Sequence, residues 1–133
     1  MFPRGSVVSG PEPRDSRRRV LVVDDDADWR HFLAECLADL GYRAMEASSG
    51  EEALALLAHQ AFGIILLDLR MPGMNGEEVA RRLPGGAGRV VFLTGAPVDE
   101  VGPALRQGPH YYLPKGANRQ ELSMLLEALD AVA

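Results

Sequence analysis

Five polar residues end or directly follow short apolar segments of the chain, and their types are those of an ionic site. Asp24 and Asp25 follow one apolar run, and Asp68 follows another. Thr94 and Lys115 stand at the ends of two later apolar segments. If these segments are parallel strands, their carboxyl ends meet at one edge of a sheet, where open α/β folds place their functional sites. The spacing therefore brings carboxylates, a hydroxyl and an ammonium together.

The acidic residues favour a divalent cation. Four of the nine aspartates lie in the five residues that begin with Asp24. Carboxylates held about 4 Å apart repel by roughly 4 kcal/mol at an effective dielectric constant of about 20. A cation relieves that repulsion between Asp24, Asp25 and Asp68, and oxygen ligands with retained waters suit Mg²⁺. The alternative for Asp24 and Asp25 is that they only cap the first helix, a role we expect of Asp26 or Asp28.

Asp68 has the position of a nucleophile. A carboxylate can attack phosphorus to give an aspartyl phosphate. This chemistry needs a metal to neutralise the phosphoryl oxygens, a positive group opposite and a hydrogen-bond donor, which Asp25, Lys115 and Thr94 would supply in turn. The simpler alternatives are that Asp68 is a turn residue at a strand end and that Thr94 is an ordinary β-branched strand residue.

The elements that must position these groups alternate along the chain. Short apolar runs alternate with segments of helical periodicity, and strands that are apolar on both faces indicate a parallel sheet covered by helices on both sides. We therefore expect an α/β fold of five β-α units. Strands are expected at 20–23, 42–47, 62–67, 90–93 and 110–113, and helices at about 32–40, 49–59, 75–83, 97–107 (weak) and 118–129.

Composition narrows the class of protein. The 133 residues are 47% hydrophobic and 25% charged, typical of one soluble domain. The longest apolar run, 61–67, is too short to span a bilayer. The single cysteine, Cys36, permits no internal disulfide.

No secretory signal pattern opens the chain, and we expect a cytoplasmic protein. The net charge of −5 argues against a general nucleic-acid binder, and neither direct nucleic-acid binding nor membrane association is expected.

Charge is unevenly distributed. We expect residues 1–18 to form a flexible basic tail and residues 19–133 to form the domain, which carries most of the acidic charge. Thirteen of the 14 basic residues are arginine, and Lys115 is the single lysine. We hypothesise that this lysine does something that arginine cannot, although codon bias alone would also produce the ratio.

From Arg19 to its end, the chain resembles the receiver domain of two-component response regulators, of the chemotaxis-receiver type. The segment VLVVDDD at 20–26 is similar to the first strand and acid pair of that family. The segment LLDLRMPGMNG at 66–76 resembles its phosphorylation segment, and this match is very specific. The segments VFLTG at 91–95 and YLPK at 112–115 resemble the strands that carry the switch hydroxyl, the switch aromatic residue and the essential lysine.

The resemblance implies a flavodoxin-like, doubly wound (βα)5 fold with strand order 2-1-3-4-5. It also implies that Asp68 accepts a phosphoryl group from a histidine kinase or phosphotransfer protein. Asp25, Asp68 and the main-chain carbonyl of Arg70 would bind Mg²⁺ directly, and Asp24 would hold it through water. The domain would catalyse only its own phosphorylation and dephosphorylation, and would not be a metabolic enzyme.

The resemblance further implies a conformational switch. Lys115 would pair with the phosphoryl group or with Asp68, Thr94 would move to bond a phosphoryl oxygen, and Tyr112 would turn inward behind it. The result would be a population shift read by an output protein that the sequence does not name. The domain would act alone or as a piece of a hybrid kinase or longer regulator.

Departures from the family pattern leave rival interpretations open. Gly116 replaces the proline that usually follows the lysine, and Gly-Pro at 102–103 interrupts the fourth helix. These features favour the main alternative, which is an interaction module with the same fold that acts without phosphorylation. An aspartyl-phosphate phosphatase usually needs a second acid two positions past its nucleophile, where this chain has Arg70. A flavodoxin-type redox protein would need a phosphate-binding loop in place of the acidic cluster.

Overall fold

The computed structural model describes residues 17–95 and 111–131 of the chain. The helix expected at 97–107 and the tail up to residue 16 lie outside the described residues. The elements in chain order are β1 (Arg19–Val23), α2 (Ala27–Asp39), β2 (Arg43–Ala47), α3 (Gly50–Leu57), β3 (Ile64–Asp68), α4 (Gly76–Arg81), β4 (Arg89–Thr94), β5 (Tyr111–Pro114) and α6 (Arg119–Ala131).

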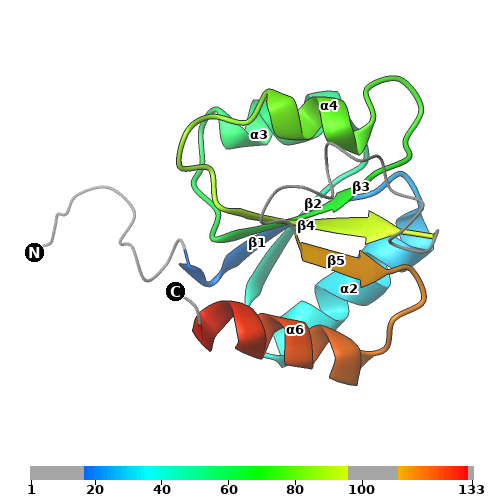
Figure 1. Cartoon of the computed structure of the whole chain (residues 1–133), viewed down its shortest axis with the longest axis vertical. Coiled ribbons are helices and arrows are strands. Elements are labelled where there is room, and N and C mark those ends of the chain that lie inside the picture. Colours follow the sequence, from blue (N-terminus) through cyan, green and yellow to red (C-terminus); the bar gives the residue numbers. More distant parts are fainter. Residues whose placement is uncertain (1–16, 96–110, 132–133) are drawn as a thin grey trace, which may run out of the picture.

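The strands form one five-stranded sheet in the order β2-β1-β3-β4-β5, and every neighbouring pair is parallel. Helices α3 and α4 cover one face of the sheet, and α2 and α6 cover the other (Figure 1). This confirms the expected doubly wound α/β fold and its 2-1-3-4-5 order. The order reverses between β1 and β3, where such folds place their functional sites.

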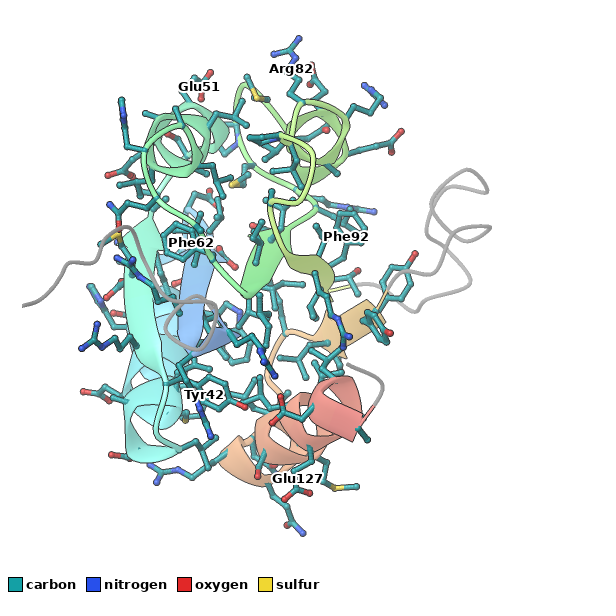
Figure 2. All side chains as sticks on the ribbon, turned by 90° about the vertical axis from the view of Figure 1, so that its left-hand side faces the viewer. Tyr42, Glu51, Phe62, Arg82, Phe92 and Glu127 are labelled. Atoms are coloured by element: carbon teal, nitrogen blue, oxygen red, sulfur yellow. The ribbon has the colours of Figure 1, made fainter. Side chains whose placement is uncertain are left out.

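Each buried strand sends alternate side chains into two cores. Val20 and Val22 of β1 pack with α2 and α6, whereas Leu21 and Val23 pack with α3 and α4. Figure 2 shows Phe62 and Phe92 on the side of α3 and α4, and Tyr42 on the side of α2 and α6. The apolar runs lack a polar face because both faces of the sheet are covered.

Side-chain caps fix where the helices begin. The Asp26 carboxylate accepts hydrogen bonds from two backbone N–H groups of the first turn of α2, so Asp26 is the cap of this helix. Ser49 caps α3, and Asn75 caps α4 in a reciprocal capping box. Asn118 exchanges the same kind of hydrogen bonds at the start of α6.

Several element boundaries differ from those expected. Helix α3 ends at Leu57 and α4 at Arg81, two residues earlier than the sequence pattern predicts in each case. For α4 the reason is Pro84, which disfavours helical conformation in the residue before it. Strand β3 runs from Ile64 to Asp68, whereas the sequence pattern predicts 62–67. Phe62 lies before the strand and is buried in the core. Among the described residues, no helix is both long and apolar enough to cross a membrane.

Candidate phosphoryl-acceptor and metal site

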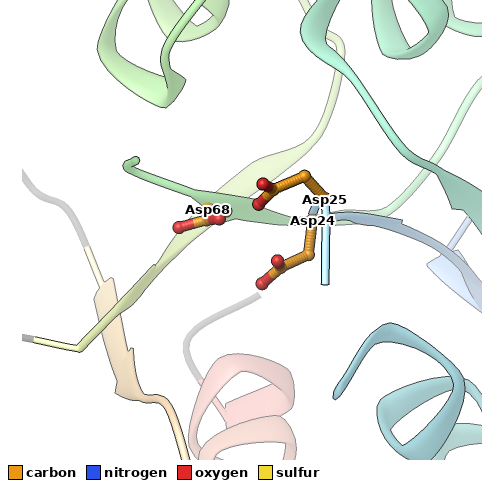
Figure 3. Close-up of side chains that lie close together, drawn as sticks. All are labelled: Asp24, Asp25 and Asp68. Atoms are coloured by element: carbon orange, nitrogen blue, oxygen red, sulfur yellow. The ribbon is translucent and has the colours of Figure 1, made fainter. Parts of the chain in front are cut away.

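Three carboxylates meet at the carboxyl edge of the sheet, beside the point where the strand order reverses. Asp24 and Asp25 follow β1, and Asp68 ends β3 (Figure 3). One oxygen of each lies within 4.8 Å of the others. Asp24 and Asp68 are 0% and 1% exposed, whereas Asp25 is open to solvent. The sequence prediction that these acids converge is confirmed by this geometry.

Backbone hydrogen bonds hold the carboxylates in place. The Asp24 N–H donates to the carbonyl of Ala47 at 3.1 Å, and Asp24 Oδ1 accepts from the N–H of Asp26 at 2.9 Å. Asp68 Oδ1 accepts from the N–H of Arg70 at 3.0 Å. The two buried acids are therefore oriented before any ligand binds.

Lys115 joins the two buried carboxylates. Its Nζ lies 3.0 Å from Asp68 Oδ2 and 3.3 Å from Asp24 Oδ2. The Lys115 N–H donates to the carbonyl of Thr94 at 2.9 Å, which fixes the end of β5 beside β4. The lysine is thus aimed at the acids by its own backbone.

Burial and charge act in opposite directions on these groups. Desolvation raises the pKa of Asp68 to about 6, although hydrogen bonds from the Arg70 N–H and from Lys115 oppose the shift. Partial burial lowers the pKa of Lys115, but its hydrogen bond to Asp68 and the charges of Asp68 and Asp24 outweigh burial and raise it. Lys115 therefore stays protonated at neutral pH, and one ammonium faces two carboxylates.

The donor set fits a hard divalent cation. Asp24 Oδ2 is buried and accepts no hydrogen bond from the described residues, and among these residues only the Lys115 ammonium, 3.3 Å away, balances its charge. All three side chains offer oxygen, and Asp25 is accessible to water. Oxygen ligands with open positions for water are the preference of Mg²⁺.

The remaining predicted site residues lie around this cluster. Thr94 is buried at the end of β4, beside Lys115. Tyr112 of β5 packs on Phe92, with ring centroids 5.8 Å apart. The Arg70 side chain is exposed beyond Asp68. Gly116 adopts a φ of +92°, a conformation that a residue with a Cβ rarely takes.

Sequence reasoning missed one pair of residues near the site. Arg30 of α2 donates to the carbonyl of Asp24 at 2.8 Å and to Glu46 of β2 at 2.9 Å. The two side chains come from different elements, and no local motif marks them as partners. The signal available in the sequence was weak, because an arginine near the start of a helix is most often a solvated residue.

Comparison with known proteins agrees with the site. Residues 20–127 match the response regulator receiver domain family. The chain belongs to this family. As a receiver domain it is a signalling module of two-component systems, and the resemblance inferred from the sequence motifs is confirmed.

Proteins of similar sequence include a receiver protein and a sensor protein. A response regulator receiver protein of Anaeromyxobacter sp. (strain Fw109-5) is 41% identical over 101 residues, which are 74% of this chain and 42% of that protein. The virulence sensor protein BvgS of Bordetella bronchiseptica is 42% identical over 81 residues, 61% of this chain and 6% of that protein. The chain thus spans less than half of the length of either relative.

Solved structures show the same fold. The chemotaxis protein CheY4 of Vibrio cholerae superposes with a TM-score of 0.73 at 30% identity, covering 83% of this chain and 96% of that one. The response regulator TrrA of Thermotoga maritima, in complex with Mg²⁺-BeF, superposes with a TM-score of 0.74 at 31% identity, covering 84% of this chain and 98% of that one.

Proposed function

We propose that this receiver domain accepts a phosphoryl group on Asp68 in a Mg²⁺-dependent reaction. The observation that carries the proposal is the contact of one ammonium with the acceptor carboxylate. Lys115 Nζ lies 3.0 Å from Asp68 Oδ2, in a cluster where the oxygens of Asp24, Asp25 and Asp68 lie within 4.8 Å of one another. Such a site has a nucleophile, a metal-ligand set and a fixed positive charge.

Asp25, Asp68 and the main-chain carbonyl of Arg70 would hold the metal, with Asp24 acting through water. When bound, Mg²⁺ supplies positive charge that neutralises the phosphoryl oxygens. An oxygen of Asp68 attacks the phosphorus of a phosphohistidine. The bond from phosphorus to that oxygen forms as the bond to nitrogen breaks, and the imidazole leaves with its electron pair. Lys115 pairs with a phosphoryl oxygen as the charge shifts.

We also propose Thr94 and Tyr112 as the switch. Thr94 ends the strand next to Asp68, and Tyr112 packs on Phe92 in the same part of the sheet. A hydroxyl that turns toward a phosphoryl group on Asp68 would leave space that the tyrosine ring can fill. That coupled movement would change the surface presented to an output protein.

The phosphoryl donor is, on this proposal, a histidine kinase or a phosphotransfer protein in the cytoplasm. The fold similarity to the receiver domain of the hybrid histidine kinase CckA, with a TM-score of 0.70 at 27% identity, supports this class of partner. The phosphorylation-independent alternative is less well supported, because the acid pair, Asp68 and the lysine are all present, the acids lie close together, and Lys115 contacts Asp24 and Asp68.

Beryllofluoride, which mimics a phosphoryl group on a carboxylate, tests the proposal. We expect it to bind the wild type only when Mg²⁺ is present, and not to bind Asp68→Asn. Intact-mass spectrometry after incubation with acetyl phosphate should show a single phosphoryl group on the wild type and none on the variant. Absence of Mg²⁺-dependent binding in the folded wild type would overturn the phospho-acceptor assignment.

A further inference from the structure

Arg30 connects the acidic loop after β1 with the edge strand β2. It lies on α2 with its side chain only 13% exposed. Its Nε donates to Glu46 Oε1 at 2.9 Å, and its Nη1 donates to the carbonyl of Asp24 at 2.8 Å. Glu46 Oε1 also lies 2.8 Å from Nδ1 of His31, the next residue on the helix. One guanidinium therefore makes two directed contacts at different nitrogens.

The backbone of Asp24 is held at both of its polar groups. Its N–H donates to Ala47, which follows Glu46 in β2, and its carbonyl accepts from Arg30. That carbonyl belongs to the peptide unit that leads into Asp25. Because the exposed Asp25 side chain projects from this peptide, its position relative to Asp68 depends on how the peptide is oriented (Figure 3).

We propose that Arg30 is a positioning residue that sets the Mg²⁺ affinity of the site by holding the Asp24 carbonyl. Glu46 has an indirect part, because it fixes the guanidinium that makes the contact. The inference rests on the proposed function, since it assigns a residue to the same metal site. Arg30 touches neither metal nor phosphoryl group and acts through Asp24 and Asp25. Partners that orient metal ligands typically contribute 10- to 100-fold to metal affinity.

A calorimetric titration with Mg²⁺ tests the proposal. We expect Arg30→Met, which keeps an unbranched apolar stem, to bind Mg²⁺ about 10-fold more weakly than the wild type. Arg30→Lys should keep part of the affinity that Arg30→Met loses. An ammonium can donate to the Asp24 carbonyl or to Glu46, but it lacks the separate guanidinium nitrogens that contact both. Glu46→Gln should weaken binding less, and its effect should largely vanish in the Arg30→Met background.

A second readout separates positioning from a general structural role. At saturating Mg²⁺ the rate of phosphorylation by acetyl phosphate should return to within about twofold of wild type in Arg30→Met, since Asp68, Lys115 and Thr94 are untouched. Arg81→Met is the matched control, because Arg81 also pairs with a glutamate, Glu77, but on α4. Its Mg²⁺ affinity should equal that of the wild type. Urea unfolding in EDTA identifies conditions in which each variant is fully folded.

The outcomes separate this inference from the proposed function. A wild type that fails to bind Mg²⁺ contradicts the proposed function itself. A wild type that binds, together with a folded Arg30→Met of equal affinity, overturns only the role of Arg30. A maximal rate that stays low at saturating Mg²⁺ also overturns it. Should Arg30→Met fail to fold, Arg30→Lys and Glu46→Gln carry the test, and equal affinity in both contradicts the proposal.

Discussion

Lys115 is the single lysine among 14 basic residues, and its contacts explain why arginine would not serve there. Its Nζ lies 3.0 Å from one oxygen of Asp68 and 3.3 Å from one of Asp24. A compact ammonium reaches both carboxylates from one point. A guanidinium is wider and planar, and it directs its donors along fixed lines. Codon usage can account for the arginines, but it does not place the exception at this site.

We therefore expect Lys115→Arg to fold and to bind Mg²⁺, yet to be phosphorylated by acetyl phosphate about 100-fold more slowly, the usual loss for one misplaced electrostatic donor. The rate is measured by intact-mass spectrometry at saturating Mg²⁺. Arg119→Lys, a charge-conserving exchange on α6, is the control and should react like the wild type. A Lys115→Arg protein that reacts at the wild-type rate would show that the shape of the cation does not matter.

Asp68 gives a second test at the same scale. Its pKa of about 6 in the fold exceeds the ordinary value of 3.8, because burial disfavours its charge. The folded state therefore binds more protons than the unfolded chain between about pH 4 and pH 6, and stability falls as pH rises through this window. Without metal, Asp68→Asn should be more stable than the wild type at pH 7, by on the order of 2 kcal/mol.

The free energies of unfolding of both proteins are measured in urea with EDTA from pH 4 to pH 7. The advantage of Asp68→Asn should shrink toward pH 4, where the wild-type carboxyl is protonated. Glu35→Gln removes an exposed charge on α2 and should follow the wild type across the range. An Asp68→Asn protein less stable than the wild type at pH 7 would mean that the contact with Lys115 outweighs desolvation.

At the scale of elements, the start of α4 is pressed against the end of β3. Gly76 is the first residue of α4, and a Cβ there would clash with the carbonyl oxygen of Asp68 and lie 2.9 Å from the Cα of Leu69. Gly76→Ala should therefore push on the backbone that carries Asp68. We expect a loss of about 1–3 kcal/mol in stability together with weaker Mg²⁺ binding.

Gly85→Ala is the matched control for Gly76→Ala. A Cβ at Gly85 would meet no atom within 4 Å, so its stability should stay within about 0.5 kcal/mol of wild type. Urea unfolding and a Mg²⁺ titration measure both variants. If Gly76→Ala binds Mg²⁺ as tightly as Gly85→Ala does, the contact between α4 and β3 has no part in placing Asp68.

The sequence predicts a structural feature well when the interactions that cause it join residues close together in the chain. The caps at Ser49, Asn75 and Asn118 act within three residues, and the helices expected from about 49, 75 and 118 begin beside them. The acids meet as predicted because parallel strands must end at one edge. The link from Arg30 to Glu46 could not be predicted, because it depends on how α2 packs against β2 at 16 residues' separation.

At the scale of the whole molecule, charge is separated along the strands. The carboxyl edge of the sheet holds Asp24, Asp25 and Asp68. The amino ends of β1, β2 and β4 begin with Arg19, Arg43 and Arg89. Repulsion within the acidic edge opposes folding, whereas a cation that binds only the folded cluster favours it. A metal ion bound at this edge would partly cancel the net charge of −5 where the acidic residues are most concentrated.

Mg²⁺ should therefore stabilise the whole domain against unfolding. A ligand that binds only the folded state, present at 100 times its dissociation constant, adds about 2.7 kcal/mol to the free energy of unfolding, which raises the melting temperature by several degrees.

Scanning calorimetry at increasing MgCl₂ should show a melting temperature that keeps rising with the logarithm of the Mg²⁺ concentration above the dissociation constant. NaCl at equal ionic strength gives the part due to screening, which should be smaller. Asp25→Asn removes one proposed, exposed metal ligand and should lose most of the Mg²⁺-specific rise, whereas Glu35→Gln should keep it. Equal rises in Asp25→Asn and the wild type would mean that Mg²⁺ stabilises the fold at some place other than the acidic edge.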